Sequence, residues 1–263
     1  MINKKLLPLS LLAITCSSHT FAEQLPTPQW FNSIEYVYLN DGYFDFNAYQ
    51  IVSHYYFEKQ QSSGVLDDYG YLDTDSNIKL DYTNSNYNNQ LGISGEGFYN
   101  NWFATGKLYD TGNTDNYTVG IGYLFANALK VSLLKEEREF GDDYFRIRAQ
   151  YNHQINDKDY LGLSIETYDE LDAWSATARY FNHLSDDRYL VFDFGHQDND
   201  SYNSSSAMVS YYFNRKYALG MGIDDSDLSL QAKYFINNQY YLIANFTRED
   251  PGELYSLKFV AQF

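Results

Sequence analysis

Residues 149–164 read AQYNHQINDKDYLGLS: a strand-like stretch, an aromatic residue, a tight turn of Asn and Asp, another aromatic residue and a second strand-like stretch. Three later stretches follow the same plan, at residues 178–193 (ARYFNHLSDDRYLVFD), 209–222 (VSYYFNRKYALGMG) and 232–245 (AKYFINNQYYLIAN). Aromatic side chains on both sides of alternate turns are typical of the girdle that a membrane β-barrel places at one interface. A β-sandwich has no physical reason for that placement.

Alternation of apolar and polar residues extends the pattern over most of the chain. In residues 117–125, Tyr, Val, Ile, Tyr and Phe alternate with Thr, Gly, Gly and Leu, and residues 145–151, 228–234 and 257–263 show the same period. A period of two indicates strands with one apolar face. The sequence predicts sixteen such strands, at residues 30–40, 43–57, 76–85, 88–97, 101–110, 115–125, 128–138, 142–153, 158–168, 172–183, 187–197, 204–214, 216–224, 227–236, 239–248 and 253–263.

The length and spacing of these strands predict the fold class. Each is about ten residues long, and short polar turns separate them, as in outer-membrane barrels. We therefore predict an all-β fold, a transmembrane antiparallel up-and-down β-barrel of about sixteen strands, with fourteen to eighteen open. An even number of strands brings both chain ends to the periplasmic side, where the aromatic-flanked turns then lie. The stretches TGNTDN, EFGDD, QDNDSYNSS, DDSD and REDPGE form the outer connections.

Composition excludes several other classes of protein. The 263 residues carry a formal net charge of −17, and 19% of them are aromatic. A nucleic-acid-binding protein needs a basic surface, so this partner is not expected. Disordered chains are poor in aromatic residues, so the chain folds. No stretch reaches the roughly 18 apolar residues of a membrane-spanning helix.

The N-terminus resembles an export signal in its order of charge and hydropathy. Lys4 and Lys5 precede an apolar stretch at residues 6–14, and residues 20–22 end in the small residue that secretory cleavage prefers. We predict a cleaved signal peptide at residues 1–22, Sec-type export and a location in the cell outer membrane. The alternative is a short N-terminal helix of the folded domain.

The single cysteine of the chain, Cys16, lies within this leader. It could be a lipoprotein acceptor, although residues 13–15 before it make a poor lipobox. Without it, the predicted barrel domain at residues 23–263 contains no cysteine, so neither disulfides nor thiolate metal sites hold it together.

One predicted connection is much longer than the others. Residues 58–75 read EKQQSSGVLDDYGYLDTD and lie on the periplasmic side if the strand count is right. Two interpretations stay open. The segment is either an unstructured long turn or a short element tucked under or into the barrel. In the second case its apolar anchors are Leu66, Tyr69, Tyr71 and Leu72.

Eight bases within the strands take the face opposite the apolar stripe. A charge on the lipid face costs about 2–4 kcal/mol at the membrane midplane, so these side chains point inward. The alternatives are ion-pair ladders that fill a closed barrel or the wall of a water-filled pore, and sixteen strands favour the pore. The predicted lumen-lining bases are Lys79, Lys107, Lys130, Arg146, Arg148, Arg179, Lys233 and Lys258. The inward acids are Asp81, Glu96, Glu136, Glu166, Asp193 and Asp224.

Catalytic and metal-binding patterns are weak. The sequence has no GxSxG motif and no His/Cys metal spacing. The one grouping that could act in hydrolysis is His196 with Asp193, Asp198 and Asp200. We therefore predict no enzymatic activity, no cofactor and no dedicated metal site. The acidic clusters at residues 198–200, 224–227 and 249–250 are either solvated rim or weak divalent-cation sites shared with lipopolysaccharide phosphates.

The C-terminal stretch LYSLKFVAQF, with Phe263 at its end, resembles the signal by which the barrel-assembly machinery recognises outer-membrane proteins. The chain as a whole resembles the porins of Gram-negative gammaproteobacteria. The resemblance rests on Tyr36 and Tyr38, on HYYFEKQQSSG followed by LDDYGYLDTDSNIKLDY, on the tyrosine-flanked turns and on Phe263.

This resemblance implies an outer-membrane channel for passive diffusion of small hydrophilic solutes. Its partners would be outer-membrane lipids, lipopolysaccharide and the barrel-assembly machinery. In a departure from general trimeric porins, the sequence shows no long loop that we expect to fold inward as a constriction, which leaves pore size and a homotrimer open. A non-conducting structural or adhesive barrel and a barrel hydrolase are the alternative functions.

Overall fold

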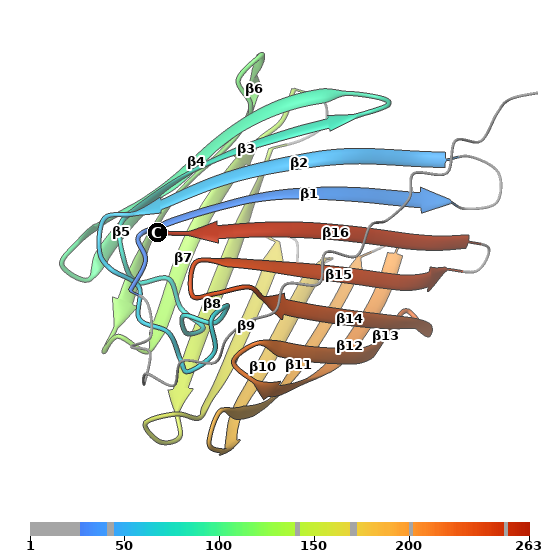
Figure 1. Ribbon diagram of the computed structural model, residues 1–263. Coiled ribbons are helices and arrows are strands. Elements are labelled where there is room, and N and C mark those ends of the chain that lie inside the picture. Colours follow the sequence, from blue (N-terminus) through green and yellow to red (C-terminus); the bar gives the residue numbers. More distant parts are fainter. Residues whose placement is uncertain (1–26, 41–44, 140–142, 169–172, 200–201, 250–251) are drawn as a thin grey trace, which may run out of the picture.

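The computed structural model describes residues 27–40, 45–139, 143–168, 173–199, 202–249 and 252–263 (Figure 1). The predicted signal peptide at residues 1–22, with Cys16, lies outside the described residues. So do Asp200 and Asp250, which belong to two of the acidic clusters. No helix that is long and apolar enough to cross a membrane occurs among the described residues.

Sixteen antiparallel strands form one closed barrel, in which each strand pairs with its neighbours in sequence and β1 pairs with β16. The predicted fold class is therefore confirmed. The strands are β1 (Trp30–Asn40), β2 (Asp45–Tyr56), β3 (Asn77–Ser85), β4 (Asn89–Tyr99), β5 (Trp102–Asp110), β6 (Asn113–Phe125), β7 (Leu129–Glu137), β8 (Tyr144–Gln154), β9 (Tyr160–Tyr168), β10 (Trp174–Ser185), β11 (Arg188–Asn199), β12 (Tyr202–Asn214), β13 (Tyr217–Asp224), β14 (Asp227–Phe235), β15 (Tyr240–Glu249) and β16 (Gly252–Gln262).

The outer face of the barrel is apolar. Ile121, Leu133 and Ile147 are cross-strand neighbours on β6, β7 and β8, and each is about half exposed. A continuous apolar surface of this kind is unfavourable in water and marks contact with a membrane. Because side chains alternate across a strand, the intervening residues face the barrel interior.

Tight turns connect most strands. Asn100, Asn127 and Asp186 adopt positive φ in the turns β4–β5, β6–β7 and β10–β11. Asn and Asp tolerate this conformation, and two-residue hairpin loops require it. These turns lie at the barrel end that also holds the C-terminus, as the aromatic-flanked repeats indicate.

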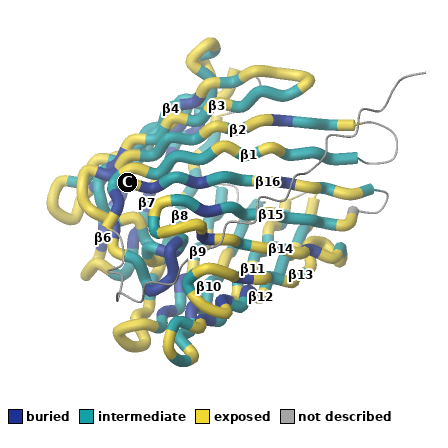
Figure 2. The backbone as a smooth tube through the Cα atoms, viewed as in Figure 1, coloured by how far each residue is buried: buried dark blue, intermediate teal, exposed yellow. Residues whose placement is uncertain are grey.

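The long connection between β2 and β3, residues 57–76, is named the inward segment. It is the cyan coil at the C-terminal end of the barrel in Figure 1, and it carries the buried stretch visible in Figure 2. Val65 and Leu66 are only 2% and 3% exposed and belong to one apolar cluster with Phe181 and Phe235. The interpretation as an element tucked into the barrel is confirmed, and an unstructured turn is excluded.

The four apolar anchors that the sequence analysis named make different contacts. Leu66 is in the cluster, and Tyr71 packs against it. Tyr69 makes an edge-to-face contact with Phe31 of β1, with ring centroids 5.0 Å apart. Leu72 is only half-buried and lies outside the cluster of described buried residues.

Candidate functional site

Two adjacent carboxylates hold the inward segment against the wall of the barrel. Asp67 accepts a hydrogen bond from the ammonium of Lys233 on β14 at 2.7 Å and another from the hydroxyl of Tyr212 at 3.1 Å. Asp68 accepts a bond from Arg179 on β10 at 3.1 Å and one from Tyr160 at 2.7 Å. Charge-assisted hydrogen bonds are the strong ones, and here two of them anchor successive residues to strands on one side of the lumen.

Two glycines allow close approach between the segment and the wall. The ring of Tyr71 lies on Gly162 of β9 so closely that a Cβ at this position would be 2.1 Å from a ring carbon. The hydroxyl of Tyr71 is 2.9 Å from Oγ1 of Thr177 on β10. Gly64 has φ of +130°, which only glycine adopts readily, and faces the ring of Tyr189. The segment is therefore fitted to this wall in detail.

Lys233→Met is expected to weaken the docking of the segment by about 3 kcal/mol, since losing one partner of a buried pair leaves an uncompensated charge. The side chains of Lys233 and Asp67 are only 14% and 6% exposed. In the refolded protein, chymotrypsin should then cut after Tyr69 or Tyr71 much faster than in the wild type. Lys233→Met with Asp67→Asn should recover most of the protection. Equal cleavage rates in the wild type and the single variant would contradict the expectation.

Interior space remains on the other side of the barrel. A polar cavity of about 300 Å³ is lined entirely by residues of β3 to β8. The inward segment, in contrast, packs Val65, Leu66 and Tyr71 on the wall formed by β9 to β16. It also reaches β7, where the ammonium of Lys130 donates to the backbone carbonyl of Asp73 at 3.0 Å. The segment thus occupies the interior beside β9 to β16, and the polar cavity lies beside β3 to β8.

The predicted lumen-lining residues fall into two groups with different surroundings. Arg179 and Lys233 form ion pairs with the inward segment. Lys258 lies outside the cavity, with its Nζ atom 3.3 Å from Oε2 of Glu35 on β1. The others lie at or beside the cavity on β3 to β9. These are Lys79, Glu96, Lys107, Lys130, Glu136, Arg146, Arg148 and Glu166. Their role in lining a conducting path stays a prediction.

Most charges beside the cavity form ion pairs. Arg146 bridges Glu136 at 3.0 Å and Glu166 at 2.7 Å, and Arg148 also contacts Glu166. Lys130 pairs with Glu96 across three strands. These are the interior ladders that the sequence analysis set against a pore, and in the described structure they stand beside an open cavity. The ion pairs are thus present, and the role of these residues as the wall of a water-filled pore stays a prediction.

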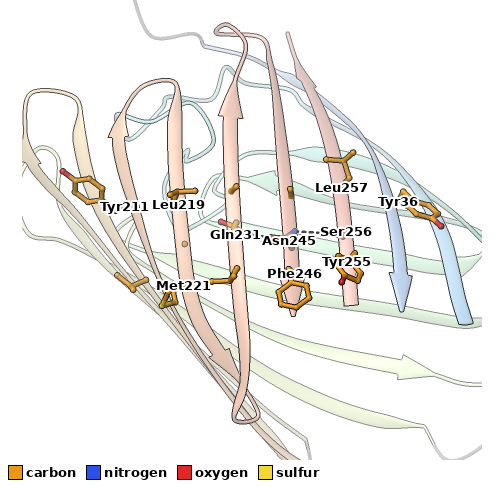
Figure 3. A pocket seen from close by; sticks show the side chains of 15 residues that line it. Tyr36, Tyr211, Leu219, Met221, Gln231, Asn245, Phe246, Tyr255, Ser256 and Leu257 are labelled. Atoms are coloured by element: carbon orange, nitrogen blue, oxygen red, sulfur yellow. Dashed lines mark hydrogen bonds between the residues drawn. The ribbon is translucent and has the colours of Figure 1, made fainter. Parts of the chain in front are cut away.

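An uncharged wall faces this cluster. Gln231, Asn245 and Ser256 form a hydrogen-bonded row across β14, β15 and β16, with both bonds at 2.9 Å (Figure 3). Phe246 of β15 and Leu257 of β16 lie on the opposite face of these strands, because side chains alternate along a strand. The sequence analysis named no residue of this row because it followed charge. The sequence signal for these residues is that each is polar and lies at an inward-facing position of an alternating strand.

Of the residues weighed as a hydrolytic grouping, Asp200 lies outside the described residues and Asp193 lies apart from His196. Nδ1 of His196 lies 2.9 Å from Oγ of Ser205, and its ring packs against Trp174. Asp193 is on the opposite face of β11, because it pairs with Arg179 and strand side chains alternate. The alternative in which His196 and Asp193 share a hydrolytic site is therefore not supported. Within the described ranges, no group of three His, Cys, Asp or Glu residues could hold a metal ion.

The chain was compared with known families and structures. A family model described as "Putative general bacterial porin" matches residues 4–258. No curated protein sequence matches the chain.

Several solved structures are similar in fold. The outer membrane protein Omp33 of Acinetobacter baumannii is 14% identical, with a TM-score of 0.60 over 91% of this chain and 100% of that one. OprB of Pseudomonas putida at low pH is 13% identical, with a TM-score of 0.55 over 90% and 92%. A triple mutant of the Rhodopseudomonas blastica porin is 10% identical, with a TM-score of 0.54 over 89% and 99%. At these identities the likeness concerns the fold.

Proposed function

Since the chain belongs to the family of general bacterial porins, we propose that small hydrophilic solutes cross it along the wall of β3 to β8, beside the inward segment. As a porin it is an outer-membrane channel for passive diffusion. The observation that supports this path is that the two sides of the barrel interior differ. Apolar contacts of the inward segment cover β9 to β16, whereas the polar cavity is lined by β3 to β8.

The charged residues beside the cavity would give the path its electrostatic character. Ions passing here meet ammonium and guanidinium groups that are mostly paired with carboxylates. Such pairs keep the net field small while leaving a hydrated surface. Charges inside a narrow lumen are screened less than charges on an exposed rim. We therefore assign the lumen-lining role to Lys79, Glu96, Lys107, Lys130, Glu136, Arg146, Arg148 and Glu166.

Single-cysteine labelling tests this path, because residues 23–263 contain no cysteine of their own. Gln150→Cys places a thiol in the cavity, and Val260→Cys places one in the apolar cluster under the inward segment. In planar bilayers, a charged methanethiosulfonate reagent should lower the current through each Gln150→Cys channel. The matched Val260→Cys channel should keep its current, because its side chain is only 5% exposed. Block at Val260→Cys without block at Gln150→Cys would contradict the assigned path.

We also propose that residues 1–22 are removed on Sec-type export and that the barrel-assembly machinery inserts residues 23–263 into the outer membrane. The order of charge and hydropathy at residues 4–22 supports the first step, and the aromatic C-terminus supports the second. Contact with lipids and lipopolysaccharide follows from an apolar outer face. A homotrimer would bury part of that face.

A further inference from the structure

We propose that Lys79, Ser94 and Lys107 form a binding row for a small carboxylate anion inside the channel. The proposal rests on the proposed channel function and names the class of solute that this path favours.

The register of three strands places these residues side by side. Lys79 of β3 is the cross-strand partner of Ser94 of β4, and Ser94 is the partner of Lys107 of β5. Partners in register share a face, so all three side chains point to the cavity that they line. Neighbouring strands are about 4.8 Å apart, which puts the Cα atoms of the two lysines about 10 Å apart. Their flexible four-carbon stems can bring both ammonium groups to one anion, with the Ser94 hydroxyl between them.

These two lysines are also the interior bases whose charge is left available. The other six predicted interior bases each form an ion pair with a described carboxylate. Neither Lys79 nor Lys107 does so with any residue in the described part of the chain. The ammonium of Lys107 instead lies 4.1 Å from the centroid of the Tyr109 ring. A cation–π contact on a hydrated wall is worth only about 0.5–1 kcal/mol, so an anion can compete for this ammonium.

The nearest candidate for pairing, Asp81, is held in another way. Its carboxylate lies flat over Gly92, so that a Cβ at this position would be 2.7 Å from Oδ2. Glycine at 92 thus lets Asp81 rest on the backbone of β4. In that position Asp81 forms no ion pair with either lysine, although its charge still attracts the ammonium of Lys107.

The surrounding cavity suits a small organic anion. Its volume of about 300 Å³ corresponds to about ten water molecules at about 30 Å³ each. The lining includes the side chains of Thr105, Thr118 and Gln150, which can hydrogen-bond a carboxylate. Of the five bases that line it, Lys130, Arg146 and Arg148 are paired with carboxylates, so the charge offered to an anion is that of Lys79 and Lys107. A dicarboxylate of five carbons fits this space and can reach both lysines.

Glutarate is the probe for the test, added to refolded protein in planar bilayers and, separately, in detergent by calorimetric titration. We expect saturable glutarate binding and current block in the wild type. Lys79→Gln with Lys107→Gln should weaken both by about tenfold, the lower range of effects from a focused field. Lys79→Arg with Lys107→Arg should retain them. Lys258→Gln, which removes an interior base outside the cavity, should change them less than about twofold.

The two readouts separate this proposal from the channel function. Glutarate affinity that is equal in the wild type and the double Gln variant overturns the binding row, whatever the conductance. Conductance steps without glutarate binding would overturn the proposed binding row and would leave the channel function unaffected. Binding that the double Gln variant weakens, in a protein that never conducts, supports the row and overturns the channel function.

Discussion

Deleting residues 60–74 and closing the chain with an Asn-Gly turn should raise single-channel conductance by at least about threefold, since sixteen-stranded barrels otherwise leave an aqueous channel. The deletion removes Val65 and Leu66 from the wall of β9 to β16 and opens that half of the interior. Planar-bilayer recording of the refolded variant measures the change directly. Liposome swelling with sugars of graded size should show a higher size limit.

The barrel itself should survive this deletion. Every strand keeps both of its hydrogen-bonded neighbours, and Arg179 keeps Asp193 as a partner at 2.6 Å. Gly162→Val serves as a milder variant, because its side chain would occupy the place of the Tyr71 ring without shortening the chain. Its conductance should lie between those of the wild type and the deletion. Wild-type conductance in both variants would mean that the inward segment lies outside the conducting path.

Deletion of Phe263 should lower the amount of protein in the outer membrane several-fold, with the remainder degraded in the periplasm. The main chain of Phe263 closes the seam between β1 and β16. Its carbonyl accepts hydrogen bonds from Gln29 at 2.6 Å and Trp30 at 2.9 Å, and its N–H donates to Trp30 at 2.8 Å. The deletion removes these bonds together with the aromatic end of the terminal signal.

Phe263→Tyr is the control for this experiment, because it keeps the backbone bonds and an aromatic ring beside Tyr240. Immunoblots of separated membranes from cells expressing each variant measure the outcome. The control should reach wild-type amounts. Normal amounts of the deletion variant in the outer membrane would refute the role given to Phe263.

The strands could be predicted from the sequence because period-two alternation is local. The predicted strand at residues 43–57 corresponds to β2 (Asp45–Tyr56), and the one at residues 227–236 to β14 (Asp227–Phe235). One residue of slip would have exchanged the two faces, and the apolar outer face prevents such a slip. Fold class therefore followed from pattern alone.

The placement of the inward segment could not be predicted, because its partners are distant in sequence. Asp67 and Lys233 are 166 residues apart, and no period in residues 57–76 indicates where they dock. The same limit applies to charge pairing. Alternation puts Lys79 on the inner face, but only the register shows that its neighbour on β4 is Ser94 instead of an acid.

The position of the inward segment in the chain also sets an order of folding. The segment follows the second strand, yet its docking surface is completed only by β16, where Gln262 donates to the carbonyl of Leu66 from 196 residues away. Contacts of such high sequence separation form late, because the closure of long loops costs entropy first. Until then we expect the charged side chains of Asp67 and Asp68 to favour a hydrated, undocked segment, because a buried charge without a partner is costly. We therefore expect the barrel interior to stay wide until β16 has paired, and to be narrowed by the inward segment only after that.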